Sequence, residues 1–254
     1  MPTRPPRTRL YVDAPLENGA LVPLDGDAAH HAVGVLRLGA GDAVALFNGR
    51  DGEWAATIET ATRKAATVRA ETQTRPQMPE SDIRVLFAPL KKTATDYAVE
   101  KATEMGVARL SPVITQRTET RRLNAGRLAA TARDAAQQSE RLSVPVIDDL
   151  APLDAVLADW DPGRTLFVCA EREDAPPLAQ AVREHKGPHA FLIGPEGGFQ
   201  REELDAIMKL PFVVAITLGP RILRAETAIV AALAIWQCTI GDGSGGDAPG
   251  TNQT

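Results

Sequence analysis

Short apolar runs separated by turn residues characterise the first 74 positions of the chain. Clustered or alternating apolar residues predict β-strands at residues 10–14, 20–24, 43–48 and 53–60. The segment from Asn48 to Gly52 supplies two glycines and an asparagine, which suit the positive φ angles of a hairpin turn. Asp27 is a candidate N-cap for a helix that runs from His30 to Leu36. The pattern therefore predicts a small β-rich domain with one helix in residues 1–74.

A different pattern, apolar runs that alternate with amphipathic segments, occupies residues 83–240. The apolar runs predict strands at residues 83–90, 109–114, 144–147, 165–170, 189–194 and 212–218. Helical periodicity fills the gaps near residues 94–105, 124–140, 152–158, 176–185, 201–209 and 224–238. Strands that are apolar on both faces and separated by helices imply a parallel sheet that is covered on both sides. The second domain is therefore expected to be α/β.

Two segments have the composition of connecting or terminal chain. Residues 75–82 combine two prolines with polar residues and show no periodicity, which indicates a linker between the domains. Residues 241–254 contain almost no apolar surface to offset the entropy of ordering, so we expect a disordered tail there.

The composition suits a soluble globular protein, because 44% of the residues are hydrophobic. The longest apolar runs, 212–218 and 228–236, are far shorter than the ~20 residues that a membrane-spanning helix needs. Residues 1–9 are rich in proline and arginine and lack the apolar stretch of a secretion signal. Cys169 and Cys238, the only cysteines, each lie in an apolar segment that suits a small buried thiol. We expect a cytoplasmic protein with no membrane association and no disulfide.

The charge of the chain permits a nucleic-acid partner only through local clusters. A net charge of −5 argues against a surface that binds nucleic acid everywhere, because phosphate binding depends on Lys and Arg. Positive charge is concentrated at Arg4, Arg7 and Arg9, and residues 117–141 carry six arginines against three acids. Such clusters also occur on solvated helix faces, so they permit an RNA partner without requiring one.

The loop at residues 194–199 follows a predicted strand and precedes a predicted helix, at the edge of the sheet where α/β proteins bind ligands. Its paired glycines, Gly197 and Gly198, let backbone groups approach a ligand closely. Glu196 would repel phosphate, and the glycine spacing fits neither common phosphate-binding motif. The loop therefore favours a cationic or neutral ligand, and a plain tight turn is the alternative.

A second loop, residues 218–227, leaves the last predicted strand and enters the last predicted helix. Glu226 at the helix start is ordinary complementation of the helix dipole. Arg224 is unusual there, because a cation at the positive end of a helix is electrostatically disfavoured. Residues placed against local preference are more often functional, which makes Arg224 a candidate site residue.

Four segments in this order resemble the RsmE family of SPOUT methyltransferases. They are KATEMGV (101–107), DAAQQSERLSVPVI (134–147), IGPEGGF (193–199) and LGPRILRAETA (218–228). The similarity extends over nearly the whole chain and includes Arg9-Leu-Tyr11 and HHAVGVLR (30–37) near the N-terminus. Met105 stands where Leu is usual and Gln137 where Glu is common, but neither position lies in the two diagnostic loops.

The resemblance implies a fold and a cofactor. The fold would be a PUA-like β-barrel that binds RNA (1–74), a linker (75–82) and an α/β domain with a deep trefoil knot (83–240), a rare exception to the rule that chains do not thread their own loops. S-adenosylmethionine would lie within the knot. The positions that match the family's cofactor loops are Gly194, Glu196, Gly197, Gly198, Leu218, Gly219, Ile222, Leu223 and, at the rim, Arg224.

The implied reaction is methylation of N3 of a uridine in 16S ribosomal RNA of the 30S subunit. Arg224 or Arg117 would stabilise the negative charge that develops on the uracil oxygens, because arginine is a permanently charged planar donor. Arg9, delivered from the barrel domain or from the partner subunit, is a further candidate for this role. Glu196 would accept the N3 proton or would only orient its loop. The positions that match the family's RNA-binding residues are Arg9, His30, Arg37, Arg117, Gln138 and Arg141.

The resemblance also implies a homodimer whose active sites border the subunit interface. Ile229, Leu233 and Trp236 of the last helix form an apolar face that suits either that interface or the core. No metal is expected, because no cluster of ligands accompanies His30 and His31. Three alternatives remain: methylation of a ribose 2′-hydroxyl, a non-catalytic PUA-like RNA-binding assembly factor, and a generic nucleotide-binding α/β protein.

Overall fold

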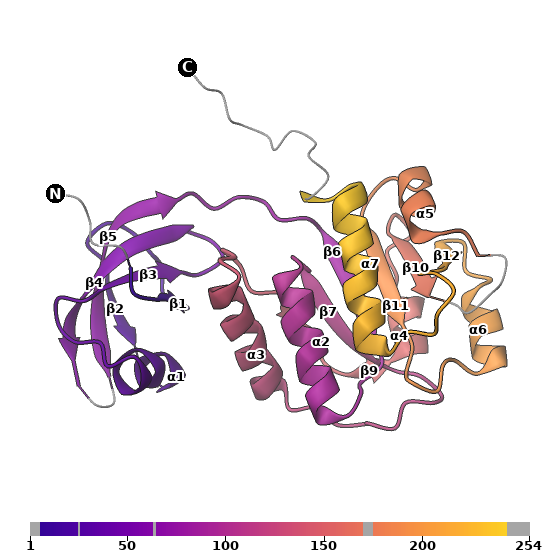
Figure 1. Ribbon diagram of the computed structural model, residues 1–254, viewed down its shortest axis with the longest axis horizontal. Helices are drawn as coiled ribbons and strands as arrows, with labels where there is room; N and C mark the ends of the chain where they lie inside the picture. Colours follow the sequence, from indigo (N-terminus) through magenta and orange to yellow (C-terminus); the bar gives the residue numbers. More distant parts are fainter. Residues whose placement is uncertain (1–5, 25, 63–64, 170–174, 243–254) are drawn as a thin grey trace, which may run out of the picture. The chain divides into compact units, whose positions relative to one another are not determined.

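The computed structural model divides into two compact units (Figure 1). It describes residues 6–24, 26–62, 65–169 and 175–242. The first unit consists of Met1–Pro79 and Arg133–Val144, and the second consists of Glu80–Ala132 and Pro145–Thr254. The division after Pro79 falls inside the segment that the sequence suggests as a linker. Residues 133–144, which the sequence pattern groups with the α/β domain, pack with the first unit, and most of the tail, from residue 243 onward, lies outside the described residues.

The first unit contains one five-stranded sheet. Its strands are β1 (Arg9–Tyr11), β2 (Leu21–Leu24), β3 (Ala43–Phe47), β4 (Glu53–Ala61) and β5 (Ala66–Arg75). The spatial order is β1-β3-β4-β5-β2, in which β1 and β3 are parallel and the other neighbours are antiparallel. The sequence pattern predicts four of these strands and misses β5. The second half of β5 is exposed and polar, so it lacks the apolar alternation by which strands are recognised.

The helix of the first unit begins earlier than the sequence predicts. A short α-helix, α1 (Gly26–Ala29), continues into a π-helical segment, η1 (His30–Val35), in which the Leu36 N–H donates to the His31 carbonyl at 3.0 Å. Because the helix starts at Gly26, Asp27 lies inside its first turn, and the prediction of Asp27 as N-cap is wrong.

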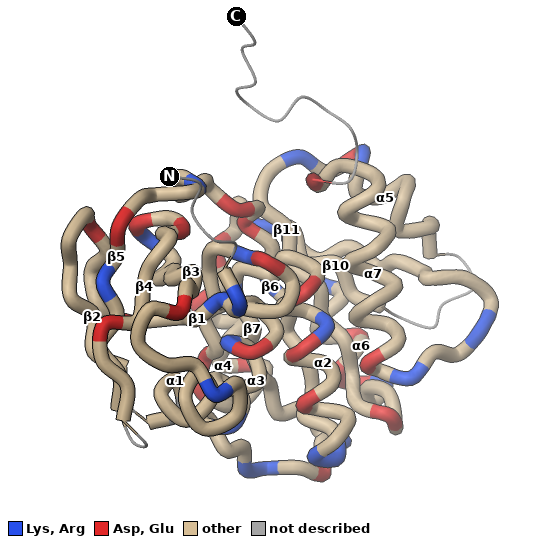
Figure 2. Tube along the Cα trace, turned by 60° about the vertical axis from the view of Figure 1, so that its left-hand side comes forward, with Lys and Arg blue, Asp and Glu red and all other residues tan. Residues whose placement is uncertain are grey.

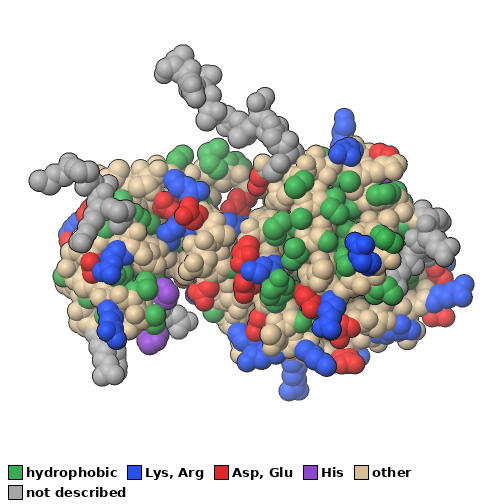
Figure 3. Space-filling view, in the orientation of Figure 1, with side chains coloured by type: hydrophobic (Ala, Val, Ile, Leu, Met, Phe, Trp, Pro, Cys, Tyr) green, Lys and Arg blue, Asp and Glu red, His purple; other side chains and the backbone are tan. Residues whose placement is uncertain are grey.

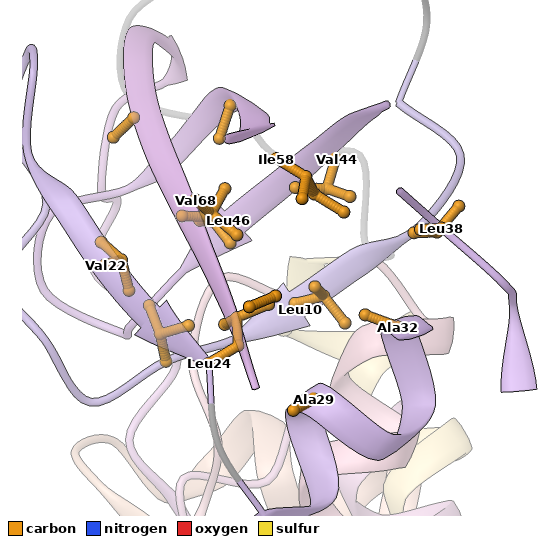
Figure 4. Close-up of a cluster of buried hydrophobic side chains, with 14 of the residues drawn as sticks. Leu10, Val22, Leu24, Ala29, Ala32, Leu38, Val44, Leu46, Ile58 and Val68 are labelled. Carbon is orange, nitrogen blue, oxygen red and sulfur yellow. The ribbon is translucent and has the colours of Figure 1, made fainter. Parts of the chain in front are cut away.

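The core of the first unit lies between the sheet and this helix (Figure 4). The helix contributes Ala29 and Ala32, which are 1% and 0% exposed. Their short side chains allow a close approach of the helix to the sheet. The sheet contributes the larger side chains, which include Leu10, Val22, Leu24, Val44, Leu46, Ile58 and Val68.

The second unit is an α/β layer structure with a parallel sheet. Its strands are β6 (Ile83–Phe87), β7 (Arg109–Ile114), β8 (Val146–Ile147), β9 (Ala151–Pro152), β10 (Thr165–Cys169), β11 (His189–Ile193) and β12 (Val213–Ile216). Its helices are α2 (Lys92–Glu104), α3 (Ala125–Gln138, whose last residues belong to the first unit), α4 (Leu153–Ala158), α5 (Leu178–Glu184), α6 (Arg201–Ile207) and α7 (Ala225–Thr239). The strand order is β12-β10-β11-β6-β7-β8, with β9 also beside β7, and every pair is parallel. The prediction of a parallel α/β sheet is therefore confirmed, and only the two-residue strand β9 is additional.

Helices cover the sheet and complete its core. Leu153 and Leu157 of α4 and Ile207 of α6 pack on side chains of β6, β10 and β11. The ring of Trp160 stacks on Phe212, with 5.7 Å between the ring centroids. In the described part of the chain, no helix has the length and apolar content needed to span a bilayer.

Helix α7 packs against α2, α5 and β11. The apolar face predicted for it faces inward, because Ile229, Leu233 and Trp236 are 1%, 0% and 6% exposed. These three side chains are therefore core residues, and the interface interpretation is wrong for them. Cys238 is exposed, so the prediction of a buried thiol is also wrong there. Burial raises the pKa of the Cys169 thiol to about 12.

A buried histidine links α7 to the sheet. His189 at the start of β11 is 3% exposed and accepts a 3.0 Å hydrogen bond at Nδ1 from the Trp236 indole N–H. Its Nε2 lies 2.9 Å from the His185 carbonyl, so the neutral tautomer with the proton on Nε2 satisfies both contacts. Burial lowers the pKa of His189, because the charged ring loses its hydration.

The lowered pKa of His189 makes the stability of the protein depend on pH. Below about pH 6.5 the unfolded chain takes up a proton at this ring that the folded chain refuses, so the free energy of unfolding should fall as the pH falls from 7.5 to 5.5. His189→Asn keeps an acceptor for Trp236 and should flatten this pH dependence in urea unfolding. The same change at exposed His30 serves as the control and should leave the dependence as in the wild type. Equal slopes for wild type and His189→Asn would contradict the assignment.

Candidate functional site

The loop after β11 is shaped by a packing contact and a turn. An added Cβ on Gly194 would lie 2.8 Å from the Phe199 ring, and Phe199 packs on the core of the second unit. Gly198 has a φ of +66°, which a side chain rarely adopts, and its N–H donates to the Pro195 carbonyl at 2.8 Å. The turn leaves Glu196, Gly197 and Gly198 exposed. Backbone groups of this loop are therefore accessible to a ligand.

The loop after β7 holds the loop after β11 in place through Gln116 and Arg117, which we call the clamp. Arg117 follows β7 and donates from Nη1 to the Gly197 carbonyl at 2.5 Å and from Nη2 to Gln200 Oε1 at 3.3 Å. The N–H of Gln116 donates to Glu203 Oε1 of α6 at 2.9 Å. The sequence pattern gives no signal for Gln200 or Glu203 as partners of the clamp, because both lie outside the glycine motif.

The clamp depends on a pair of buried threonines. Thr115 and Thr118 are 2% and 4% exposed, and their hydroxyl oxygens lie 2.9 Å apart. The Thr118 hydroxyl also accepts the Thr115 N–H at 2.8 Å. This tight turn directs Gln116 and Arg117 away from the core, toward the loop after β11.

The loop after β12 ends at the start of α7. Thr217 bridges to the chain before α5, where its N–H donates to the Pro176 carbonyl at 3.0 Å. Gly219 has a φ of +112° and open space where a side chain would stand. Ile222 is 82% exposed, an unusual position for a large apolar side chain. Arg224 is exposed at the N-cap of α7.

The surroundings of Glu226 differ from those that the sequence predicts. Glu226 lies in the first turn of α7, and its Oε2 is buried without a hydrogen-bond partner in the described structure. Buried polar atoms are nearly always paired, so an orphan carboxylate oxygen requires an explanation, and a bound partner or a functional role is one. Dipole complementation alone predicts a solvated carboxylate here.

The sheet brings these loops to one edge. Strands β7, β11 and β12 are parallel members of one sheet, so their carboxyl ends point the same way. Only β10 separates β11 from β12, which sets their loops roughly 10 Å apart at the strand spacing. Among the residues with described placement, no group of three or more His, Cys, Asp and Glu is arranged to hold a metal ion.

In the first unit, Arg9 joins β1 to residues 133–144. Its Nε donates to Glu53 Oε2 at 2.6 Å, and its Nη atoms donate to the carbonyls of Ala136, Gln137 and Arg141 at 3.2, 3.0 and 2.8 Å. The guanidinium also lies over the Phe47 ring, 4.6 Å from its centroid. Four of its five N–H groups are therefore used inside this unit. RNA binding by Arg9 stays a prediction. If RNA bound through these four N–H groups, it would compete with the contacts of Arg9 inside the unit.

The other predicted RNA-binding residues of the first unit are more accessible. His30, Arg37 and Gln138 are exposed, and Arg141 is partly buried. Arg37 has a φ of +56° directly after the helix, a position at which glycine is usual. A left-handed conformation costs an L-residue about 1 kcal/mol or more. The presence of arginine in place of glycine at position 37 therefore favours a functional role for this side chain.

Removal of the Arg9 guanidinium should destabilise the first unit strongly. Its side chain and that of Glu53 are only 11% and 12% exposed. Arg9→Ala would remove the nearest cation from a largely buried carboxylate, which keeps only the Thr74 hydroxyl at 3.0 Å and the Arg75 guanidinium at 3.8 Å, and three carbonyls would lose a donor. We expect a loss of about 3–5 kcal/mol in unfolding free energy from urea titration. Arg7→Ala is the matched control, because Arg7 is 56% exposed and makes one ion pair at 3.5 Å; it should cost less than about 1 kcal/mol. Similar losses for the two variants would refute the assignment.

Two protein families match separate parts of the chain. Residues 76–237 match the family described as RNA methyltransferase domain, and residues 24–71 match the RNA methyltransferase PUA domain. With the parallel sheet and its glycine loops, these matches define the class of the protein as a PUA-containing RNA methyltransferase.

Individual relatives narrow this class. Ribosomal RNA small subunit methyltransferase E of Rickettsia conorii is 31% identical over 89% of this chain and 93% of its own length. The crystal structure of the Neisseria gonorrhoeae enzyme of the same name, bound to S-adenosyl methionine, has a TM-score of 0.82 at 27% identity and covers 91% of this chain and 96% of that chain. The structure of a Legionella pneumophila protein in complex with the same cofactor has a TM-score of 0.80 at 27% identity and covers 91% of this chain and 97% of that chain. The chain belongs to the family of ribosomal RNA small subunit methyltransferase E, RsmE.

Proposed function

We propose that the protein methylates N3 of a uridine in 16S ribosomal RNA of the 30S subunit, with S-adenosyl methionine as the methyl donor. Family membership supports the reaction class, and the relatives from Neisseria and Legionella support the cofactor. The observation that carries the proposal is the pair of glycine turns at one edge of the parallel sheet. A ribosomal RNA substrate would make the cytoplasm the site of action.

The residues at this edge fit such a cofactor. Gly198 and Gly219 both have positive φ and no atom within 4 Å of an added Cβ, so backbone groups there can approach a ligand. Leu223 and the exposed Ile222 offer apolar surface for a flat base. The orphan Oε2 of Glu226 adds negative charge, which suits a cation better than a phosphate. When bound, S-adenosyl methionine supplies a methyl group activated by a positively charged sulfur.

The protein's own contribution is orientation and electrostatics. The clamp from Arg117 holds the loop after β11 still, so that the reacting groups can be kept in line. Arg224 is exposed and has no recorded partner in the described structure, which leaves its guanidinium available for the uracil oxygens as their charge develops. Arg117 already donates to the loop, so it suits positioning better than charge stabilisation. Glu196 is exposed and can accept the N3 proton or order water beside it.

The remaining assignments extend the same proposal. The trefoil knot would bring the loops after β11 and β12 together around the cofactor. Four residues of the first unit would contact RNA: His30, Arg37, Gln138 and Arg141. The side chains of the first three are exposed, and the positive φ of Arg37 supports a functional role for that residue. The target uridine would have to leave its stack to enter the site, as bases do in most enzymes that modify them.

The proposal is tested by locating a methyl group. Purified protein with S-adenosyl methionine should restore N3-methyluridine to 16S rRNA or 30S particles from a strain that lacks the gene, as mapped by mass spectrometry. Arg224→Ala should reduce kcat by 100-fold or more, at the scale of a lost charge-stabilising donor. Arg221→Ala, in the same exposed loop, is the matched control and should retain most of the activity. Methyl groups on ribose, or no methylation at all, would overturn the proposal.

A homodimer is part of the proposed function, and α7 offers the surface for it. The inward face of α7 is already buried, yet its outward face is also apolar, with Val230, Ala231, Ala234 and Cys238. Figure 3 shows hydrophobic side chains gathered over the region of this helix. A helix that is apolar on all sides is normally covered on all sides.

The dimer is tested by a charge on the outward face of α7. Ala234→Glu should convert a species of twice the chain mass into a monomer in sedimentation, because an unpaired carboxylate in an apolar interface loses its hydration. Ala155→Glu, at an exposed position of α4, is the control and should leave the dimer intact. A monomeric wild type would contradict this part of the proposal.

A further inference from the structure

Four exposed cations form a surface cluster that the cofactor site does not use. Lys91 and Lys92 lie at the start of α2, and Arg121 and Arg122 lie in the loop between β7 and α3. We call these four residues the basic patch. Within the described structure, no hydrogen bond or ion pair is recorded for any of the four side chains. The patch therefore keeps its charge available to a partner.

A hydrogen bond brings the two halves of the patch together. The Thr120 hydroxyl donates to the Leu90 carbonyl at 3.2 Å, so the residues that follow Thr120 and Leu90 leave from adjacent points. Leu90 is itself fixed, because its N–H and carbonyl both bond to the buried Thr95 hydroxyl at 3.0 Å. The backbone segments that carry the four cations are thus held together by hydrogen bonds within one unit.

The patch is next to the candidate cofactor site. The N–H of Ala88, just after β6, donates to the Ile193 carbonyl at 3.1 Å, directly before the glycine loop that starts at Gly194. The chain that carries Arg121 and Arg122 also carries Arg117, which bonds to Gly197. Lys and Arg positions lie along the lower end of this unit in both Figure 2 and Figure 3.

The charge balance at the patch favours an anionic partner. Glu119 is the exposed acid within the same loop, and Asp96 of α2 is already paired with Arg127. Lysines at the start of α2 oppose the positive end of the helix dipole, and no acidic residue in the first turn offsets them. Such a local cost in free energy is expected where the charge serves binding.

We infer that the basic patch binds the phosphate backbone of the RNA strand that enters the cofactor site. The inference rests on the proposed function, because that function makes RNA the macromolecular substrate. Phosphate contacts fix the register of a strand without reading its bases, which suits a surface of flexible cations beside a base-specific pocket. Since the whole chain has a net charge of −5, RNA affinity has to come from such local clusters.

The inference is tested with Lys91→Glu/Lys92→Glu and a matched control. Lys186→Glu/Lys209→Glu makes the same charge change at exposed lysines that precede β11 and β12, at the opposite edge of the sheet. The readouts are equilibrium binding to 16S rRNA at several salt concentrations, KM and kcat for the methylated substrate, and calorimetric binding of S-adenosyl methionine. Acidic residues at the start of α2 suit the helix dipole, so the thermal midpoint should not fall.

The patch variant should bind RNA at least tenfold more weakly, and the slope of log affinity against log salt should fall by about 1.4, or 0.7 for each lost phosphate contact. Its kcat at saturating RNA and its affinity for S-adenosyl methionine should match the wild type, and the control should behave as wild type throughout. Arg121→Gln/Arg122→Gln, which removes charge without reversing it, should lower the slope similarly.

Two failures are distinguishable. If the wild type methylates rRNA and both patch variants bind it with an unchanged salt slope, the inference is overturned and the proposed function stands. If the wild type binds rRNA through the patch but does not methylate it, the proposed function fails and the binding surface stands.

Discussion

Every recorded strand pair in the second unit is parallel, and this single constraint assembles the site. Parallel strands end at the same edge, so loops that are far apart in the sequence leave the sheet side by side. The turn at Thr115 and Thr118 then clamps the glycine loop after β11 through Arg117. The glycine turns, the exposed Arg224 and the basic patch all depend on the direction of these strands.

Arginine serves two physically different purposes in this protein. Arg9 and Arg117 donate to backbone carbonyls, and each holds a segment against its neighbour. Arg224 and the basic patch remain exposed, where a cation keeps its hydration until a partner arrives. Among the arginines, only the surroundings of each guanidinium separate a structural from a binding role.

Most elements of the second unit could be predicted from periodicity, because its strands are apolar on both faces and its helices have the 3.6-residue repeat. Three of the failures share one cause, which is that burial of a position depends on what packs against it. The outer half of β5 is polar because nothing covers it, and Cys238 is exposed although its segment is apolar. Ile229, Leu233 and Trp236 proved to be core residues because α2, α5 and β11 already cover that face of α7.

The sequence by itself determined the class of fold, the two glycine loops and the family, because these depend on local chemistry and on motifs of adjacent residues. Only the tertiary structure decided that residues 133–144 pack with the first unit, that Arg117 is a clamp and that Glu226 keeps a buried, unpaired oxygen. The first two facts are contacts between residues distant in the chain, and the third is an oxygen that the folded chain buries without pairing it. The free energy of such a contact depends on geometry that no local pattern of side chains encodes.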